Sequence, residues 1–131
     1  MLTRRGFAAC ALCVVAGFVA TGAEAQTAAF KRTVLNRTDG PVDGYVTVSV
    51  RVEIDPGALI ARHTHPGVES AYVIEGAVEL SVDGQATRGV QPGDAFVVAR
   101  NTPHSAKNGP AKTVIASTYV VEKDKPLASP A

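Results

Sequence analysis

The chain has little cysteine, few aromatic residues and no tryptophan. Its two cysteines, Cys10 and Cys13, both lie within the first 25 of its 131 residues. If that segment is removed, the remaining chain has no thiol to form a disulfide, bind a metal or attack a substrate. A disulfide framework, a cysteine-based zinc site and a cysteine nucleophile are therefore excluded for the remaining domain.

The chain also lacks an excess of charge of either sign. From residue 26 onward it carries 11 basic and 11 acidic residues, with no run of Lys or Arg. Because nucleic-acid binding depends on a basic patch, we expect no nucleic-acid partner. No long apolar run follows residue 25, so we expect no stable membrane insertion once the N-terminal segment is removed.

The first 25 residues have the pattern of an export signal. A short basic start, Met1 to Arg5, precedes an apolar stretch from Phe7 to Ala20 that is short for a membrane span. Ala23, Glu24 and Ala25 form an A-x-A cleavage site. The pattern predicts a signal peptide over residues 1–25, a mature chain beginning near Gln26, and a periplasmic or secreted location.

The route of export is suggested by the run from Thr3 to Phe7, which contains Arg4 and Arg5 and resembles a bacterial twin-arginine signal. That resemblance implies export of a folded protein, often with its cofactor in place. An ordinary Sec signal and an uncleaved anchor are the alternatives. A lipoprotein is disfavoured because bulky Leu12 precedes Cys13.

The rest of the chain reads as a single all-β domain. Apolar and polar residues alternate from Tyr45 to Ile54, which predicts a half-buried strand. No helical period follows the signal, and eight or nine short strands separated by turn residues indicate a sandwich or barrel. We predict a linker and edge segment over residues 26–44, with an edge strand at 30–35. The domain follows over residues 45–122, and a flexible tail over 123–131.

The histidines point to a metal site. His63 and His65 stand two apart, so on a strand both imidazoles face the same side. The turn at Pro66 and Gly67 can bring Glu69 back to the same point. His104, the only other histidine in the sequence, supplies a third imidazole. Imidazoles with a carboxylate suit one divalent transition metal, such as Fe, Mn, Ni, Cu or Zn.

Two stretches carry a family resemblance. The first runs from Gly57 through His63, His65 and Glu69 to Gly76 and resembles the first cupin motif, G-x5-H-x-H-x3-E-x6-G. The second resembles the other cupin motif, G-x5-P-x-G-x2-H-x3-N, with matches at Gly93, His104 and Asn108. Ala99 and Asn101 replace its usual proline and glycine, and Asn tolerates the positive φ that such a turn needs.

The resemblance to cupins implies a double-sheet jelly-roll barrel, also called a double-stranded β-helix. It also implies a homodimer, since cupins commonly self-associate. Small single-domain cupins include dioxygenases that act on enol or phenol substrates, as well as isomerases, cyclases and lyases. We therefore expect a small-molecule substrate or ligand. A non-catalytic metal-bound module that senses or stores a ligand is the alternative, and imidazoles that only hydrogen-bond inside a barrel are another.

Positions around the ligands follow from the strand period. Leu59, Ala61, Ala71 and Val73 are in phase with the ligands and are predicted to face inward, giving a small apolar pocket. Tyr72 is out of phase and is predicted to face outward. Asn108 is predicted to fix a loop rather than to contact substrate. Tyr119 and Arg51 could line the barrel, and the pattern does not orient them. No residue besides Glu69 presents itself as a general base.

Overall fold

The computed structural model describes residues 29–131, and its regular structure in this range consists of strands. No helix in this part of the chain has the length and hydrophobicity needed to cross a bilayer. The expected signal peptide, residues 1–25, lies outside the described range. In chain order the strands are β1 (Phe30–Asp39), β2 (Tyr45–Ile54), β3 (Leu59–Thr64), β4 (Gly67–Glu75), β5 (Val78–Val82), β6 (Arg88–Val90), β7 (Ala95–Val98), β8 (His104–Asn108), β9 (Thr113–Glu122) and β10 (Ser129–Pro130).

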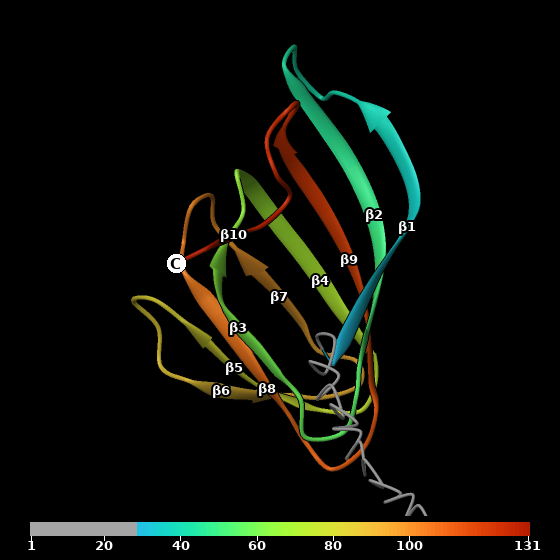
Figure 1. The fold of residues 1–131 in the computed structure, drawn as a ribbon, viewed down its shortest axis with the longest axis vertical. Coiled ribbons are helices and arrows are strands. Elements are labelled where there is room, and N and C mark those ends of the chain that lie inside the picture. The colour runs from blue at the N-terminus through green and yellow to red at the C-terminus, as the bar shows by residue number, and fades with distance from the viewer. Residues whose placement is uncertain (1–28) are drawn as a thin grey trace, which may run out of the picture.

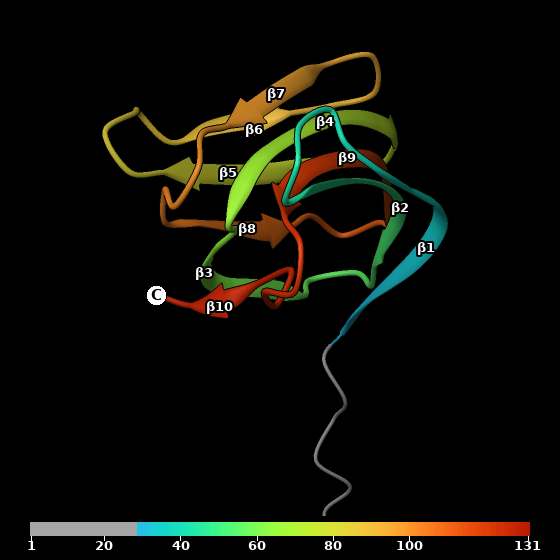
Figure 2. The same ribbon diagram turned by 90° about the horizontal axis from the view of Figure 1, so that it is seen from above.

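The strands form two antiparallel five-stranded sheets, in the orders β1-β2-β9-β4-β7 and β10-β3-β8-β5-β6. Figures 1 and 2 show the two sheets curving around a common interior. Apolar side chains from both sheets fill that interior. The alternation predicted for 45–54 is confirmed, because every second residue of β2, from Val46 to Ile54, is buried. The architecture is the jelly roll expected from the sequence.

The strand β1 is longer than the edge strand predicted at 30–35. It pairs along the full length of β2, from Phe30 opposite Ile54 to Asp39 opposite Val46, with a bulge between Val34 and Asn36. Pairing with β1 gives the outer backbone groups of β2 hydrogen-bond partners that a linker would leave exposed. Most of the segment predicted as linker is therefore part of the first sheet.

The C-terminal segment corrects the expectation of a flexible tail over 123–131. Ser129 and Pro130 pair with Thr64 and His63 to form β10, and Leu127 packs against the core. The physical reason is that β3 would otherwise be an unpaired edge, and that the tail carries an apolar side chain to bury. Figure 1 shows β10 lying beside β3.

The predicted inward positions are half right. Ala71 and Val73 of β4 are buried, as expected, whereas Leu59 is 63% exposed and Ala61 is also exposed. The cause is a bulge in β3, where Ile60 pairs with Ala106 but His63, three residues later, pairs with His104. An extra residue in a strand reverses which residues face inward. Ile60 is therefore buried, whereas Leu59 and Ala61 on either side of it are exposed.

The turn predicted at Pro66 and Gly67 leads directly into β4. Gly67 lies against β9, where an added Cβ would be 1.9 Å from the carbonyl oxygen of Val120. Only glycine permits this approach of the two backbones. The approach sets the register in which Glu69 lies opposite Tyr119. One small residue therefore fixes the position of the candidate carboxylate.

We expect Gly67→Ala to lower the melting temperature by about 10 °C. Forcing β4 away from β9 resembles overpacking, which costs about 1–3 kcal/mol, and each kcal/mol is worth about 4–8 °C in a domain of this size. Thermal unfolding followed by circular dichroism measures the effect. Gly89→Ala is the matched control, since a Cβ there meets nothing within 4 Å. Equal melting temperatures for the two variants would contradict the argument.

Candidate metal centre

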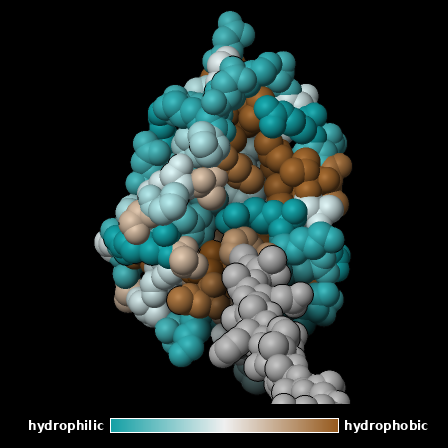
Figure 3. Space-filling model, viewed as in Figure 1, coloured by the Kyte–Doolittle hydropathy of each residue, from teal (hydrophilic) through white to brown (hydrophobic). Residues whose placement is uncertain are grey.

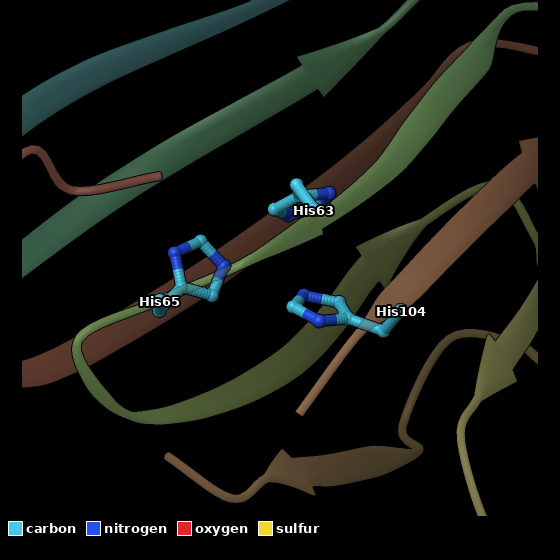
Figure 4. Close-up of side chains that lie close together, drawn as sticks. All are labelled: His63, His65 and His104. Carbon is cyan, nitrogen blue, oxygen red and sulfur yellow. The ribbon is translucent and has the colours of Figure 1, made fainter. Parts of the chain in front are cut away.

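Three imidazoles meet between the two sheets. His63 lies near the end of β3, His65 follows that strand, and His104 opens β8 directly opposite His63. The ring centroids lie 4.2–5.0 Å apart, and one nitrogen from each ring lies within 4.8 Å of the others. Figure 4 shows the three rings gathered around one point. The predicted convergence of the histidines is therefore present.

Each imidazole is oriented through a backbone carbonyl. The Nδ1 atoms of His63, His65 and His104 lie 2.7, 2.6 and 2.9 Å from carbonyl oxygens. These oxygens belong, in the same order, to Ala61, Leu127 and Thr102. A carbonyl can only accept, so each Nδ1 carries the hydrogen and each Nε2 presents a lone pair. Metal-binding histidines show the same arrangement.

The position of His65 depends on two further segments. Its carbonyl accepts a hydrogen bond from the backbone N–H of Asn101 at 3.0 Å, and the carbonyl of Pro66 accepts one from Glu122 at 3.0 Å. Asn101 has a φ of 54°, so the predicted positive-φ turn at this residue is confirmed. The loop before β8 therefore holds one ligand residue while β8 supplies another.

Glu69 faces the same point from β4. Its Oε2 lies 3.2 Å from Nε2 of His65 and 3.3 Å from Nε2 of His104. Its Oε1 accepts hydrogen bonds from the hydroxyls of Ser117 and Tyr119, each at 2.9 Å. One carboxylate oxygen is thus fully bonded, while the other is turned toward the imidazoles.

The charge of this cluster calls for a cation. Glu69 is buried, but its Oε1 accepts hydrogen bonds from the hydroxyls of Ser117 and Tyr119, which favour the charged form of the carboxylate. The Nε2 atoms of His65 and His104 are buried and have no hydrogen-bond partner among the described residues. Converging lone pairs beside a buried carboxylate leave a place that a positive ion would fill. The three histidines could hold a metal ion there.

His63 is the ligand candidate nearest to solvent. Burial, together with the neighbouring His104 and His65 and against an opposing effect of the Ala61 carbonyl, lowers its pKa to about 4. The ring is therefore neutral near pH 7, as a metal ligand must be. On its other side the Nη2 atom of Arg32, from β1, lies 3.5 Å from its Nε2.

Three residues at the site were not predicted or not oriented. Tyr119 proves to be buried, and burial together with the charge of Glu69 raises its pKa, so it remains a hydrogen-bond donor. Ser117, two residues earlier on β9, faces the same way, and Arg32 reaches the site from β1. Arg51 faces outward and lies 3.7 Å from Glu53. The alternation of residues along β9 would have predicted that Ser117 and Tyr119 face the same side. It could not have predicted that both side chains contact Glu69.

Two other predictions about single residues agree with the structure. Tyr72 is 51% exposed on the outer face of β4. Asn108 fixes a loop: its amide group donates to three backbone carbonyls, and its Oδ1 accepts from Thr113 and from the backbone of Gly109. These bonds close the connection between β8 and β9 away from the imidazoles.

A cavity of about 40 Å³ adjoins the cluster, enough for roughly three water molecules. Its walls are mostly apolar, with side chains of Val52, Ile60, Leu80, Phe96 and Ile115 beside those of the cluster. A small pocket with apolar walls was predicted, but none of the four residues predicted to line it, Leu59, Ala61, Ala71 and Val73, lines this cavity.

The cupin domain matches residues 50–121. The chain belongs to the cupin domain family. No match was found among curated proteins. Among solved structures, this cupin is similar to KdgF from Halomonas sp., with 27% identity, a TM-score of 0.61, and coverage of 73% of this chain and 82% of the other.

Two further structures are similar. A conserved double-stranded β-helix protein from Klebsiella pneumoniae has 25% identity and a TM-score of 0.61, covering 76% of this cupin and 84% of its own chain. The DMSP lyase DddQ from Ruegeria pomeroyi has 19% identity and a TM-score of 0.67, and the match covers 78% of this cupin and 51% of the lyase chain. At that identity the last comparison supports the fold alone.

The buried state of His63 gives a pH prediction for the metal-free protein. Its pKa is about 6.5 when unfolded and about 4 when folded, so between these values only the unfolded chain binds the proton. The associated stability is complete above pH 6.5 and is lost as the pH falls toward 4. The free energy of unfolding therefore changes with pH by less than the roughly 1.4 kcal/mol per pH unit that uptake of one full proton gives, because the ring is only half-buried.

Urea unfolding at several pH values between 7.5 and 5 measures this effect after metal has been removed with a chelator. His63→Asn should show a flatter dependence of the free energy of unfolding on pH than the wild type. The other titratable groups affect the pH dependence of both proteins alike, so the difference between the two pH profiles reports the contribution of His63. Parallel pH profiles would contradict the prediction.

Proposed function

We propose that this cupin is an exported metal-dependent enzyme whose single divalent transition metal is bound by His63, His65, Glu69 and His104. The observation that carries the proposal is the convergence of unpartnered Nε2 atoms on the free oxygen of a buried carboxylate. The separations of 3.2–3.3 Å suit neighbouring ligands of one ion with bonds of about 2.1 Å.

The donor set limits the metal without identifying it. Three imidazoles and a carboxylate, with no thiolate, suit Fe, Mn, Ni, Cu or Zn, and affinity alone does not select among them. Loading before export through the twin-arginine route would let the cell determine which metal is bound. When bound, the metal would act as a Lewis acid, or as a redox centre if it is iron, manganese, copper or nickel.

The surrounding residues have defined tasks in such an enzyme. The hydroxyls of Ser117 and Tyr119 hold one oxygen of Glu69 and leave the other free. Tyr119 keeps its proton, because its pKa is raised by burial and by the charge of Glu69. Among the described residues that line the cavity, Glu69 is the only carboxylate.

Access to the cluster favours an enzyme over a closed binding module. Arg32, Ile60 and His63 line both the inner cavity and an outer groove of about 240 Å³ between β1, β3 and β10. A small molecule could therefore approach His63 from the surface. We propose a dioxygenase-like reaction on a small enol or phenol. A non-catalytic ligand-binding or sensor module is the second candidate.

Metal analysis tests the centre itself. Protein purified from its native compartment should contain about one metal per chain, and chelation should lower its melting temperature by about 10 °C or more. A ligand present at a hundred times its dissociation constant adds roughly 2.7 kcal/mol. His65→Ala should remove most of the metal, while Tyr72→Phe, on the outer face, should retain it. Full metal in His65→Ala, or an unchanged melting curve after confirmed chelation, would refute the site.

Oxygen uptake separates the enzyme from the module. The loaded protein is screened against small enols and phenols with an oxygen electrode, with His65→Ala as the inactive control. Uptake that requires both metal and substrate supports the dioxygenase-like activity. Tight binding of such compounds without turnover would favour the module.

We propose export followed by cleavage after Ala25. The support is the basic start, the apolar stretch and the A-x-A site. Mass spectrometry of the exported protein should give an N-terminus at or near Gln26. Changing Arg4 and Arg5 to Lys should block export by the twin-arginine route, whereas unchanged export would indicate the Sec route. An exported protein that retains Cys10 would contradict cleavage.

We also propose that the protein forms a homodimer through β1. This strand is the outer edge of its sheet, and Val34 and Leu35 on it are 59% and 63% exposed. Figure 3 shows apolar surface gathered over the region where Figure 1 draws β1, β2 and β9. Edge strands of this kind are usually covered. Sedimentation at micromolar concentration should give a dimer that Leu35→Lys weakens, and a clean wild-type monomer would refute it.

A further inference from the structure

The first strand brings a guanidinium to the candidate metal centre. Arg32 of β1 lines the inner cavity together with His63 and Glu69, and it also lines the outer groove. Its Nε is buried and has no hydrogen-bond partner within residues 29–131, and its Nη2 makes a long 3.5 Å contact with Nε2 of His63.

Arg32 differs from the other arginines of the described chain, because Arg37 and Arg88 also lack an ion pair there but are exposed to solvent. The side chains of Arg51, Arg62 and Arg100 each lie within ion-pair distance of a carboxylate. Within residues 29–131, Arg32 forms no such pair. It is therefore a cation at the cavity whose counter-charge the described part of the chain does not provide.

The two poorly satisfied donors lie on the same edge of the guanidinium. Nε–H and one Nη2–H of an arginine run parallel and match the two oxygens of a carboxylate. If a metal takes the Nε2 lone pair of His63, the long contact is lost as well, and both donors of Arg32 need a new acceptor. Leaving buried donors unpaired is costly, so an acceptor from outside is favoured.

The guanidinium is held in this position by a neighbour. Phe30 stands two residues earlier on the same strand, and the guanidinium carbon of Arg32 lies 4.9 Å from its ring centroid. Phe30 lines the groove but not the inner cavity. The aromatic ring thus restrains the arginine, which reduces the entropy lost when it binds a ligand.

The balance of charge favours an anion. Glu69 is the only acidic side chain among the described residues that line the cavity. A divalent metal together with Arg32 leaves an excess of two positive charges in a mostly apolar pocket. We infer that Arg32 is the anion-binding residue of this cupin and that its substrates are small organic carboxylates, held with the carboxylate on Arg32 and the rest of the molecule toward the imidazoles. The inference rests on the proposed metal centre and names the substrate class for it.

Binding of a carboxylate and of its neutral ester tests the inference. The protein is loaded with Co²⁺, and the visible absorption of cobalt is followed during titration with pyruvate or methyl pyruvate. Pyruvate has the oxo group from which an enol can form, and the ester differs from it mainly in charge. Wild-type protein should bind pyruvate at least about tenfold more tightly than the ester, as expected of a hydrogen-bonded charge pair.

Variants of Arg32 locate the effect. Arg32→Gln should weaken pyruvate binding by about 10- to 100-fold while leaving cobalt content and ester binding unchanged. Arg32→Lys keeps the charge but loses the parallel donors, so its affinity for pyruvate should lie between those of the wild type and Arg32→Gln. Lys31→Gln is the matched control, because neighbouring residues of a strand face opposite sides and Lys31 is exposed. It should bind pyruvate like the wild type.

Three results would overturn the inference: equal wild-type affinity for acid and ester, no spectral change with pyruvate at millimolar concentration, or wild-type pyruvate affinity in Arg32→Gln. The wild-type comparison and Arg32→Lys decide the question even if Arg32→Gln fails to fold. Failure of the wild-type protein to take up cobalt would instead refute the metal centre, so the two failures are distinguishable.

Discussion

The structure depends on how one buried carboxylate is satisfied. Removing the charge of Glu69 from water costs several kcal/mol unless partners replace the water. Two hydroxyls from β9 satisfy one oxygen, and the other faces two imidazole nitrogens that carry no hydrogen. Strands from both sheets are therefore tied to one point in the barrel, where a cation is the missing partner. Metal binding and barrel stability are consequently linked.

Backbone atoms rather than side chains hold the imidazoles. The carbonyls of Ala61, Thr102 and Leu127 come from a strand, a loop and the C-terminal segment, and each fixes one ring. Substituting a side chain does not remove such an acceptor, so the orientation of the rings depends on the path of the chain. The bulge in β3 and the positive φ of Asn101 are parts of that path. Local irregularities of the fold thus position the site.

The sequence was sufficient for whatever depends on local patterns. Local patterns predicted an all-β sandwich or barrel, the alternation in β2, the convergence of the histidines and the loop-fixing role of Asn108, and the resemblance to cupins implied the jelly roll. The sequence failed where pairing between distant strands decides: the exposure of Leu59 and Ala61 follows from a bulge formed against β8, and the ordered tail follows from an unpaired edge of β3. Ser117 and Tyr119 lie 48 and 50 residues from Glu69, so only the strand register reveals their contact with it.

Both ends of the described chain contribute to this one site. Arg32 enters from the first strand, and Leu127 orients His65 from a segment beyond the last long strand. Contacts so far apart in sequence require the chain to close large loops before they can be made. A complete ligand set therefore exists only once nearly the whole domain has folded. A twin-arginine signal implies that folding and metal loading occur before export. The cation would then bind a folded site inside the cytoplasm. It would not have to bind an unfolded chain after export.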